Sequence, residues 1–211
     1  EAFGAPRDKI EIIPNGIDIE VFRPAYERRR ERLKSDPVQV IGFVGRVVRI
    51  KDIRTLLRAM QIIHKSLPNL ALKIFGPMDE EPEYAQDCVE FATQLGIEDA
   101  VTFAGKQDLR EVLGEVDVMV LTSISEGQPL VVLEGFACGI PCVSTDVGSC
   151  RSLIMGDSQE DRAIGPAGTL TRVASPRQIA VAVQELIKDK ERLMQLGENG
   201  RQRVECFYNQ R

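Results

Sequence analysis

Short apolar runs alternate along the chain with longer amphipathic segments. Residues 38–44 (VQVIGFV), 70–75 (LALKIF) and 116–121 (VDVMVL) are nearly continuous apolar runs with the length of buried strands. After the first run, apolar residues recur at helical spacing over 53–63, and Asp52 can cap that helix. Strands that alternate with helices of about a dozen residues predict an α/β fold, with a parallel sheet covered by helices on both faces.

The alternation continues to the end of the chain. Further strands are predicted at 101–104, at 141–145 and, as an edge strand, at 170–173. Further helices are predicted from Pro82 to Gly96, from Asp108, from Ser175 with a capping box, and from Asp189. No internal repeat or low-complexity tract interrupts this pattern.

The composition narrows the classes of partner. The net charge of -5 disfavours nucleic acid or an anionic membrane, so that any bound anion needs a local cluster of donors. No stretch approaches the roughly 18 apolar residues of a membrane span, and we expect neither membrane insertion nor a signal peptide. With five cysteines and one histidine, we expect a cytoplasmic, reduced chain without a metal site. The first residue, Glu1, suggests a piece of a longer protein.

Four loops are predicted to meet at one edge of the sheet. They cover residues 45–51, 76–82, 122–129 and 146–149, and each follows a predicted strand. Because ligands of open α/β sheets bind beyond the carboxyl ends of the strands, this edge is the predicted ligand crevice.

The segment after the strand 116–121 combines a helix start with two acids. Backbone N–H groups at the helix start, near Pro129, Leu130 and Val131, lack partners within the helix and favour an anion such as phosphate. Gly127 permits close approach. Glu134, one turn deeper in an apolar helix, suits a sugar diol such as a ribose, with a tertiary salt bridge or a backbone acceptor role as the alternative.

The loop GRVVRIKD, residues 45–52, supplies cations to the same crevice. Gly45 and Arg46 end a central strand, and Lys51 immediately precedes a helix. A planar guanidinium fork with an ammonium point charge suits a diphosphate, although two solvated surface cations are the simpler alternative. We interpret the acidic run 79–83 as a solvated helix entrance, with a place at the ligand border as the alternative.

These motifs together carry a family resemblance. GRVVRIKD, the pair Glu126 and Glu134 within SEGQPLVVLEGFACGIPCVSTDVG, and IPNGIDIEVFRP resemble the retaining family 4 glycosyltransferases. These enzymes have the GT-B architecture of two Rossmann-like domains facing across a cleft. FGPMDEEPEY and the segment around Glu126 are most similar to the PelF-type exopolysaccharide glycosyltransferases, which are associated with UDP-glucose. One departure is Ser152, where that group usually has Glu.

The resemblance covers the donor-binding, C-terminal half of such an enzyme, so the acceptor-side N-terminal domain is expected to be absent. It implies a crossover strand and linker at 1–37, with the turn at Asn15 and Gly16, a Rossmann-like core at 38–188 and a C-terminal helix at 189–211. The implied partners are a UDP-sugar, a glycan or polysaccharide acceptor and, for the full enzyme, a membrane-associated synthase complex.

Site roles follow from the same resemblance. Arg46, Lys51 and Glu126 are the implied catalytic residues: the two cations hold the donor diphosphate and stabilise the leaving UDP, and Glu126 contacts the donor sugar. Glu134 is implied to bind the ribose hydroxyls. The remaining implied donor-binding positions are Gly45, Gly76, Gly105, Lys106, Gln107, Gly127, Gln128, Pro129, Leu130 and Val131, and no cofactor or metal is implied.

Three other functions stay open. A dinucleotide-dependent oxidoreductase is disfavoured, because no G-x-G-x-x-G follows a predicted strand and GFVGRV offers only Gly42 and Gly45. A non-catalytic nucleotide-sensing module would use the same binding residues. A GT-B sugar-nucleotide epimerase is the third. Asp117, in a D-x-D-like EVD, is interpreted as a residue of a strand interior or sheet edge and not as a metal ligand.

Overall fold

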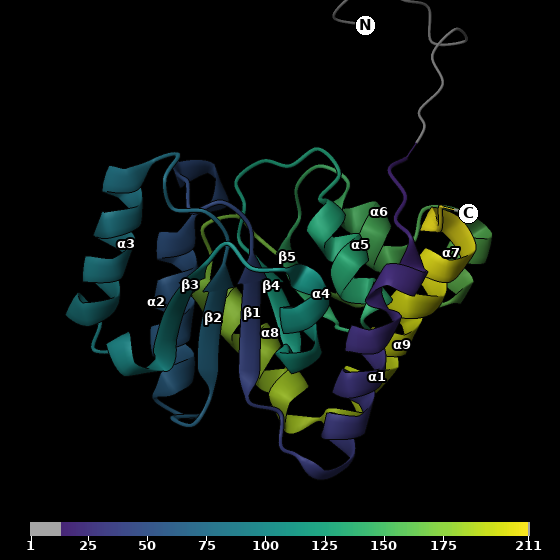
Figure 1. Ribbon diagram of the computed structural model, residues 1–211, viewed down its shortest axis with the longest axis horizontal. Helices are drawn as coiled ribbons and strands as arrows, with labels where there is room; N and C mark the ends of the chain where they lie inside the picture. The colour runs from purple at the N-terminus through teal and green to yellow at the C-terminus, as the bar shows by residue number, and fades with distance from the viewer. Residues whose placement is uncertain (1–13, 211) are drawn as a thin grey trace, which may run out of the picture.

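A six-stranded sheet in the order β3-β2-β1-β4-β5-β6 forms the centre of the computed structural model, which describes residues 14–210 (Figure 1). All neighbouring strands pair in parallel. The strands are β1 (Val40–Val44), β2 (Ala71–Phe75), β3 (Val101–Gly105), β4 (Val118–Leu121), β5 (Cys142–Thr145) and β6 (Gly168–Thr171). This is the doubly wound Rossmann order: after β3, at one edge, the chain returns to the middle of the sheet, where β4 pairs with β1. The predicted fold class is confirmed.

Helices cover both faces of the sheet, as the near-continuous burial of the central strands requires. One layer contains α2 (Ile53–His64), α3 (Pro82–Gln94) and α8 (Pro176–Lys188), with α2 packed between the other two. The other layer contains α1 (Ile19–Ser35), α4 (Leu109–Val112), α5 (Leu130–Ala137) and α9 (Lys190–Arg203). Two short helices, α6 (Cys150–Met155) and α7 (Gln159–Ala163), precede β6. Within residues 14–210, no helix is long and apolar enough to span a bilayer.

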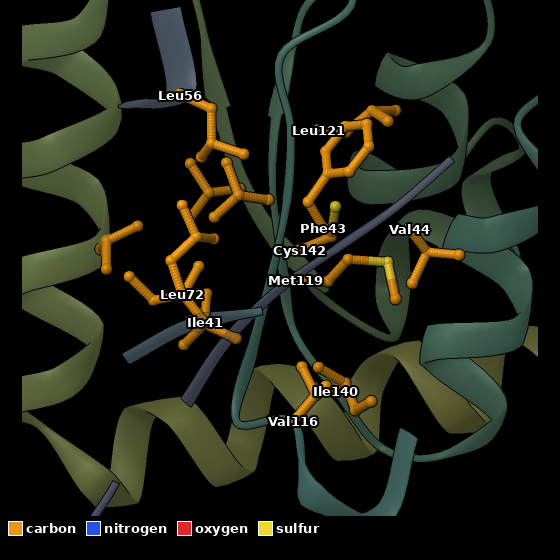
Figure 2. Packing of buried hydrophobic residues seen from close by; sticks show 14 of the residues in the cluster. Ile41, Phe43, Val44, Leu56, Leu72, Val116, Met119, Leu121, Ile140 and Cys142 are labelled. Carbon is orange, nitrogen blue, oxygen red and sulfur yellow. The ribbon is translucent and has the colours of Figure 1, made fainter. Parts of the chain in front are cut away.

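The core consists of side chains from the central strands and the helices on either face. Figure 2 shows Ile41 and Phe43 of β1, Leu72 of β2 and Met119 of β4 together with Leu56 of α2. All five are at most 2% exposed. Burial of this kind is the main favourable term that holds the helices to the sheet, and it fixes where the strand ends and their loops lie.

One predicted element is different in the structure. The described part of 1–37 contains the 17-residue helix α1 instead of a crossover strand and linker. Asp18 caps this helix by accepting a hydrogen bond from Glu20 N at 2.9 Å. Arg29 lies on its buried face and donates to three backbone carbonyls, those of Val116, Asp117 and Gly139. The helix was hidden in the sequence because an arginine takes an apolar position and Pro24 lies inside the helix.

Helix boundaries show which capping predictions hold. Asp52 and Asp108 each cap a helix with the side chain, as predicted, and Asp189 also caps the helix that begins after it. The capping box at Ser175 is wrong, because Ser175 makes no capping hydrogen bond and Gln178 accepts instead from the backbone N–H of Arg172 at 2.9 Å. After α9 the chain forms a π-helical turn, Val204–Tyr208.

Asp117 is a structural acid at the start of β4. It is fully buried and accepts hydrogen bonds from the backbone N–H groups of Gln39 and Val40, at 2.7 and 2.9 Å, and from Arg32 at 2.5 Å. The carboxylate therefore fixes the beginning of β1 against β4, which explains an acid within an apolar strand.

Candidate functional site

Two loops meet at the point where the strand order reverses. The loop after β1 and the loop after β4 leave neighbouring strands at their carboxyl ends, at the top of the view in Figure 1. They are joined by two hydrogen bonds: Ile124 N donates to the Ile50 carbonyl at 2.8 Å, and the Thr122 hydroxyl donates to the Lys51 carbonyl at 2.7 Å. Ligand crevices of open parallel sheets form at this reversal, so the geometry selects the same edge as the sequence.

Lys51 and Glu126 face one another across this crevice. The ammonium nitrogen of Lys51 lies 2.5 Å from Oε1 of Glu126, and the Ser123 hydroxyl donates to the same oxygen at 2.5 Å. The side chains of Lys51 and Glu126 are only 15% and 11% exposed. The prediction that these two residues converge is confirmed, although the direct pairing was not foreseen.

The backbone at Asp52 turns the chain sharply after Lys51. Asp52 has φ +47° and ψ +53°, a left-handed conformation that is uncommon outside glycine. Its carboxylate accepts from Thr55 N at 3.2 Å, which holds the turn while α2 begins. This turn directs Lys51 into the crevice while the next residue, Ile53, enters the core.

The start of α5 presents open backbone donors. Pro129 is its N-cap and provides neither a capping side chain nor an N–H group, so only Gln128, Leu130 and Val131 of the predicted cradle can donate. Among the described residues, no acceptor contacts the N–H groups of Leu130 or Val131. The Gln128 side chain points elsewhere and accepts from Asn15 N at 2.6 Å. The helix start therefore remains available to an anion.

The side chain of Glu134 has no partner within residues 14–210. Its carboxylate is half-buried on α5, one turn beyond Leu130, and makes no hydrogen bond or ion pair there, although the backbone carbonyl of Glu134 accepts from Cys138 N. Burial alone raises the pKa of its carboxyl above the ordinary value. The alternative of a tertiary salt bridge is not seen in this part of the chain, which favours the interpretation as a ligand-binding acid.

A pocket of about 220 Å³ brings together the predicted residues of the first three strand ends. Gly45, Arg46, Gly76, Lys106 and Gln107 line it. Its walls also include apolar side chains, from Val44, Phe75, Pro77 and Leu109. Apolar walls with a few polar groups are typical of a pocket for a flat ring such as a nucleobase.

Gly76 is required by the close approach of two loops. A Cβ atom at Gly76 would lie 2.0 Å from the Gly45 carbonyl oxygen, and φ there is +149°. The predicted residue Gly105 lies behind it, where its carbonyl accepts from Gly76 N at 2.8 Å. The three strand ends therefore pack directly on one another.

Arg46 is engaged by an acid that the sequence analysis assigned to solvent. Its guanidinium donates to Glu80, and Arg49 lies 3.5 Å from Glu81. The pKa of Arg46 is raised, first by Glu80 and to a smaller extent by the charge of Glu126, so both acids lie within electrostatic reach. The side chains of Glu80 and Glu81 are 50% and 38% exposed, so the run 79–83 is solvated as interpreted, and the two ion pairs also place it beside the cationic loop 45–52. The opposite charges of the loop 45–51 and the acidic run 79–83 were the sequence feature from which this pairing could have been expected.

Buried hydroxyl groups complete the site and were missed. Thr122, Ser123 and Thr145 are all 0% exposed, and the Thr145 hydroxyl donates to the Ser123 carbonyl at 2.7 Å. Their position at the ends of apolar strands, Thr122 and Ser123 directly after β4 and Thr145 as the last residue of β5, was the only signal in the sequence. In the described part of the chain, no group of three or more His, Cys, Asp or Glu residues could hold a metal ion.

A second and larger pocket lies at the β6 edge. Its volume is about 750 Å³, and its lining includes three arginines, Arg151, Arg172 and Arg177, with Asp146 and Glu185. None of the predicted site residues lines it. The motifs GRVVRIKD and SEGQP meet at the reversal point of the sheet, through Lys51 and Glu126, and not at this pocket.

Known proteins match most of this chain. The family description "Glycosyl transferases group 1" matches residues 26–203. D-inositol 3-phosphate glycosyltransferases of Nocardia farcinica and Stackebrandtia nassauensis are 30% and 32% identical over 205 and 207 residues. Each alignment covers 93% of this chain but only 44% and 45% of the relative. The chain therefore spans about half the length of these curated relatives.

Solved structures show the same fold. Sucrose-phosphate synthase of Thermosynechococcus elongatus superposes with a TM-score of 0.78 at 27% identity, over 94% of this chain and 48% of that one. HepE of Anabaena, in complex with UDP and glucose, gives 0.80 at 22% identity, over 98% and 55%. The C-terminal domain of LpcC, a group 1 family protein of Francisella tularensis, gives 0.73 at 21% identity, over 93% and 100%. The match over residues 26–203 shows that this chain belongs to the group 1 glycosyltransferase family.

Proposed function

We propose that this chain is the donor-binding half of a retaining glycosyltransferase of the PelF type in family 4, which transfers glucose from UDP-glucose to a growing exopolysaccharide or other glycan. The observation that carries the proposal is the convergence of Lys51 with Glu126 at the reversal point of the sheet, beside the open start of α5. A cation and free backbone donors at one place are what a diphosphate requires.

The remaining site residues fit the other parts of a UDP-sugar. The pocket of Gly45, Gly76 and Lys106 suits the base, and Glu134 suits the ribose hydroxyls because its carboxylate has no partner in residues 14–210. Glu126 lies beside the diphosphate position, where it would contact the sugar. HepE, which shares the fold, has been solved with UDP-glucose and with UDP and glucose.

In the proposed reaction, the bond between the sugar and the β-phosphate oxygen breaks first, and the electron pair stays on the phosphate oxygen. The sugar carbon passes through an oxocarbenium-like state before the acceptor hydroxyl attacks it from the same face and gives its proton to that phosphate oxygen. Lys51, the N–H groups of Leu130 and Val131, and Arg46 stabilise the charge that develops on the phosphate. Fixed donors aimed at a developing charge are the largest single contribution in many enzymes.

The proposed acceptor is a glycan and not the acceptor named for the relatives. The matched relatives are called D-inositol 3-phosphate glycosyltransferases, but this chain aligns with less than half of each. In the GT-B resemblance the acceptor lies on the other domain, so the relatives' acceptor does not carry over to this chain. An exopolysaccharide acceptor, and a membrane-associated synthase complex as its setting, rest on the PelF-type motifs alone.

Calorimetric titration with UDP, UDP-glucose and NAD tests the proposal. We expect the 211-residue chain to bind UDP weakly and NAD more weakly still, and to transfer no sugar alone because the acceptor side lies on another domain. Tighter binding of NAD than of UDP would favour the oxidoreductase. Transfer by a full-length enzyme carrying this chain would separate a glycosyltransferase from a nucleotide-sensing module and from an epimerase, because neither of these joins a sugar to an acceptor.

A further inference from the structure

The Lys51 ammonium, which the proposed diphosphate would contact, is already paired with the Glu126 carboxylate. Oε1 of Glu126 lies 2.5 Å from the Lys51 ammonium and also accepts the Ser123 hydroxyl at 2.5 Å. The carboxylate is therefore a resident anion at the position where a phosphate would bind. A ligand phosphate that approaches Lys51 must share it with this carboxylate.

The pair is held from behind by buried groups. Ser123 is fully buried, and its own carbonyl accepts the Thr145 hydroxyl at 2.7 Å. Thr122, also fully buried, donates its hydroxyl to the Lys51 carbonyl at 2.7 Å. Both members of the pair are thus anchored to the ends of β4 and β5, and Glu126 cannot swing away without breaking the Ser123 contact.

The second carboxylate oxygen remains open. Within the described residues, Oε2 of Glu126 accepts no hydrogen bond, whereas Oε1 accepts two. A hydroxyl-bearing sugar next to the diphosphate could donate to Oε2 without disturbing Lys51. UDP has no such hydroxyl at this place, and its terminal phosphate carries about one further negative charge near neutral pH.

We propose that Glu126, held by Ser123, makes the site select the sugar-bearing donor over free UDP and so promotes release of the product. Its charge repels the diphosphate of both ligands. In the donor a hydroxyl bond to Oε2 offsets this repulsion, whereas UDP brings extra charge and no hydroxyl. The inference rests on the proposed function, since it assigns a role within the same donor site.

Replacing Glu126 by Gln tests the inference by titration with UDP and UDP-glucose. A unit charge about 6 Å away at an effective dielectric constant of about 40 changes an affinity by about tenfold. Glu126→Gln should therefore bind UDP about tenfold more tightly. The affinity for UDP-glucose should change less, so that the preference for the donor falls. Ser123→Ala should shift the UDP affinity in the same direction by a smaller factor, because it only loosens the carboxylate.

Glu115→Gln is the matched control, because it removes the same charge from an exposed acid at the opposite edge of the sheet. It should leave both affinities unchanged. Unchanged or weaker UDP binding by Glu126→Gln would overturn the inference, while UDP binding by the unaltered chain would preserve the donor-site assignment. If the unaltered chain bound neither ligand, the proposed function itself would fail.

Discussion

Gly148 offers a direct test of how closely the loops of the site are packed. It lies in the loop after β5 with φ +52°, and a Cβ atom there would lie 2.1 Å from the Glu126 carbonyl oxygen. Ser149 N also donates to the Gly127 carbonyl at 2.9 Å, so this loop packs against the backbone of Glu126 and Gly127. Gly148→Ala must push the Glu126 segment outward by about 1 Å to restore ordinary contact.

Gly96 supplies the matched control for this substitution. Its φ is +65°, equally left-handed, but a Cβ atom there meets nothing within 4 Å. Gly96→Ala should cost only the left-handed conformation at a helix end, about 1 kcal/mol of unfolding free energy. Gly148→Ala should cost about 2–4 kcal/mol, because displacement of the loop at Glu126 and Gly127 adds to that conformational cost.

Function should separate the two variants more clearly than stability. A shift of about 1 Å in the loop at Glu126 and Gly127 carries on to the start of α5, three residues further along. We expect the misplaced N–H donors of Leu130 and Val131 to weaken UDP binding by Gly148→Ala by about tenfold or more, which outweighs any gain from the displaced carboxylate. Gly96→Ala should leave UDP binding unchanged. Urea unfolding and calorimetric titration measure the two effects. Equal losses of stability and affinity in the two variants would refute the packing argument.

Three further experiments test other parts of the account. Glu134→Gln should weaken UDP binding by about 1–3 kcal/mol and abolish discrimination against 2′-deoxy-UDP. The same change should raise the unfolding free energy by a few tenths to about 1 kcal/mol at neutral pH. A loss of both UDP affinity and stability would indicate a structural role for Glu134. Because the folded-state pKa of Glu134 is raised, stability should fall as pH rises from the ordinary carboxyl value through the folded pKa, and titration of Glu134→Gln should lack this fall. Lys51→Ala should weaken UDP binding and make the UDP affinity less dependent on salt concentration. An unaltered salt dependence would show that Lys51 does not contact the diphosphate. Arg203→Met should lower the unfolding free energy by about 3–5 kcal/mol, because it leaves the buried carboxylate of Asp161 unpaired. Adding Asp161→Asn should restore part of this stability, and additive losses in the double variant would contradict the argument.

The positions of the site loops could be predicted because each depends on a short, strong pattern. Buried runs such as 70–75 define parallel strands, and the carboxyl ends of parallel strands share one edge. Asp52 and Pro82 mark helix starts through local chemistry, and both were confirmed. Predictions of this kind need no knowledge of the partner that a side chain finds elsewhere in the chain.

The partners of charged residues could not be predicted, because they are set by tertiary packing. Glu126 and Lys51 lie 75 residues apart and meet only when β1 and β4 become neighbours. Glu80 was interpreted as solvated, since nothing local shows that Arg46 comes within reach. Helix α1 was missed for a similar reason: Arg29 looks like a surface residue until its three carbonyl partners are known.

The most direct test of the central claim is a structure of this chain with UDP bound. The account predicts the diphosphate within hydrogen-bond distance of the Lys51 ammonium and of the N–H groups of Leu130 and Val131, with the ribose at Glu134. A diphosphate held instead by Arg172 and its neighbours in the pocket at the β6 edge would contradict it.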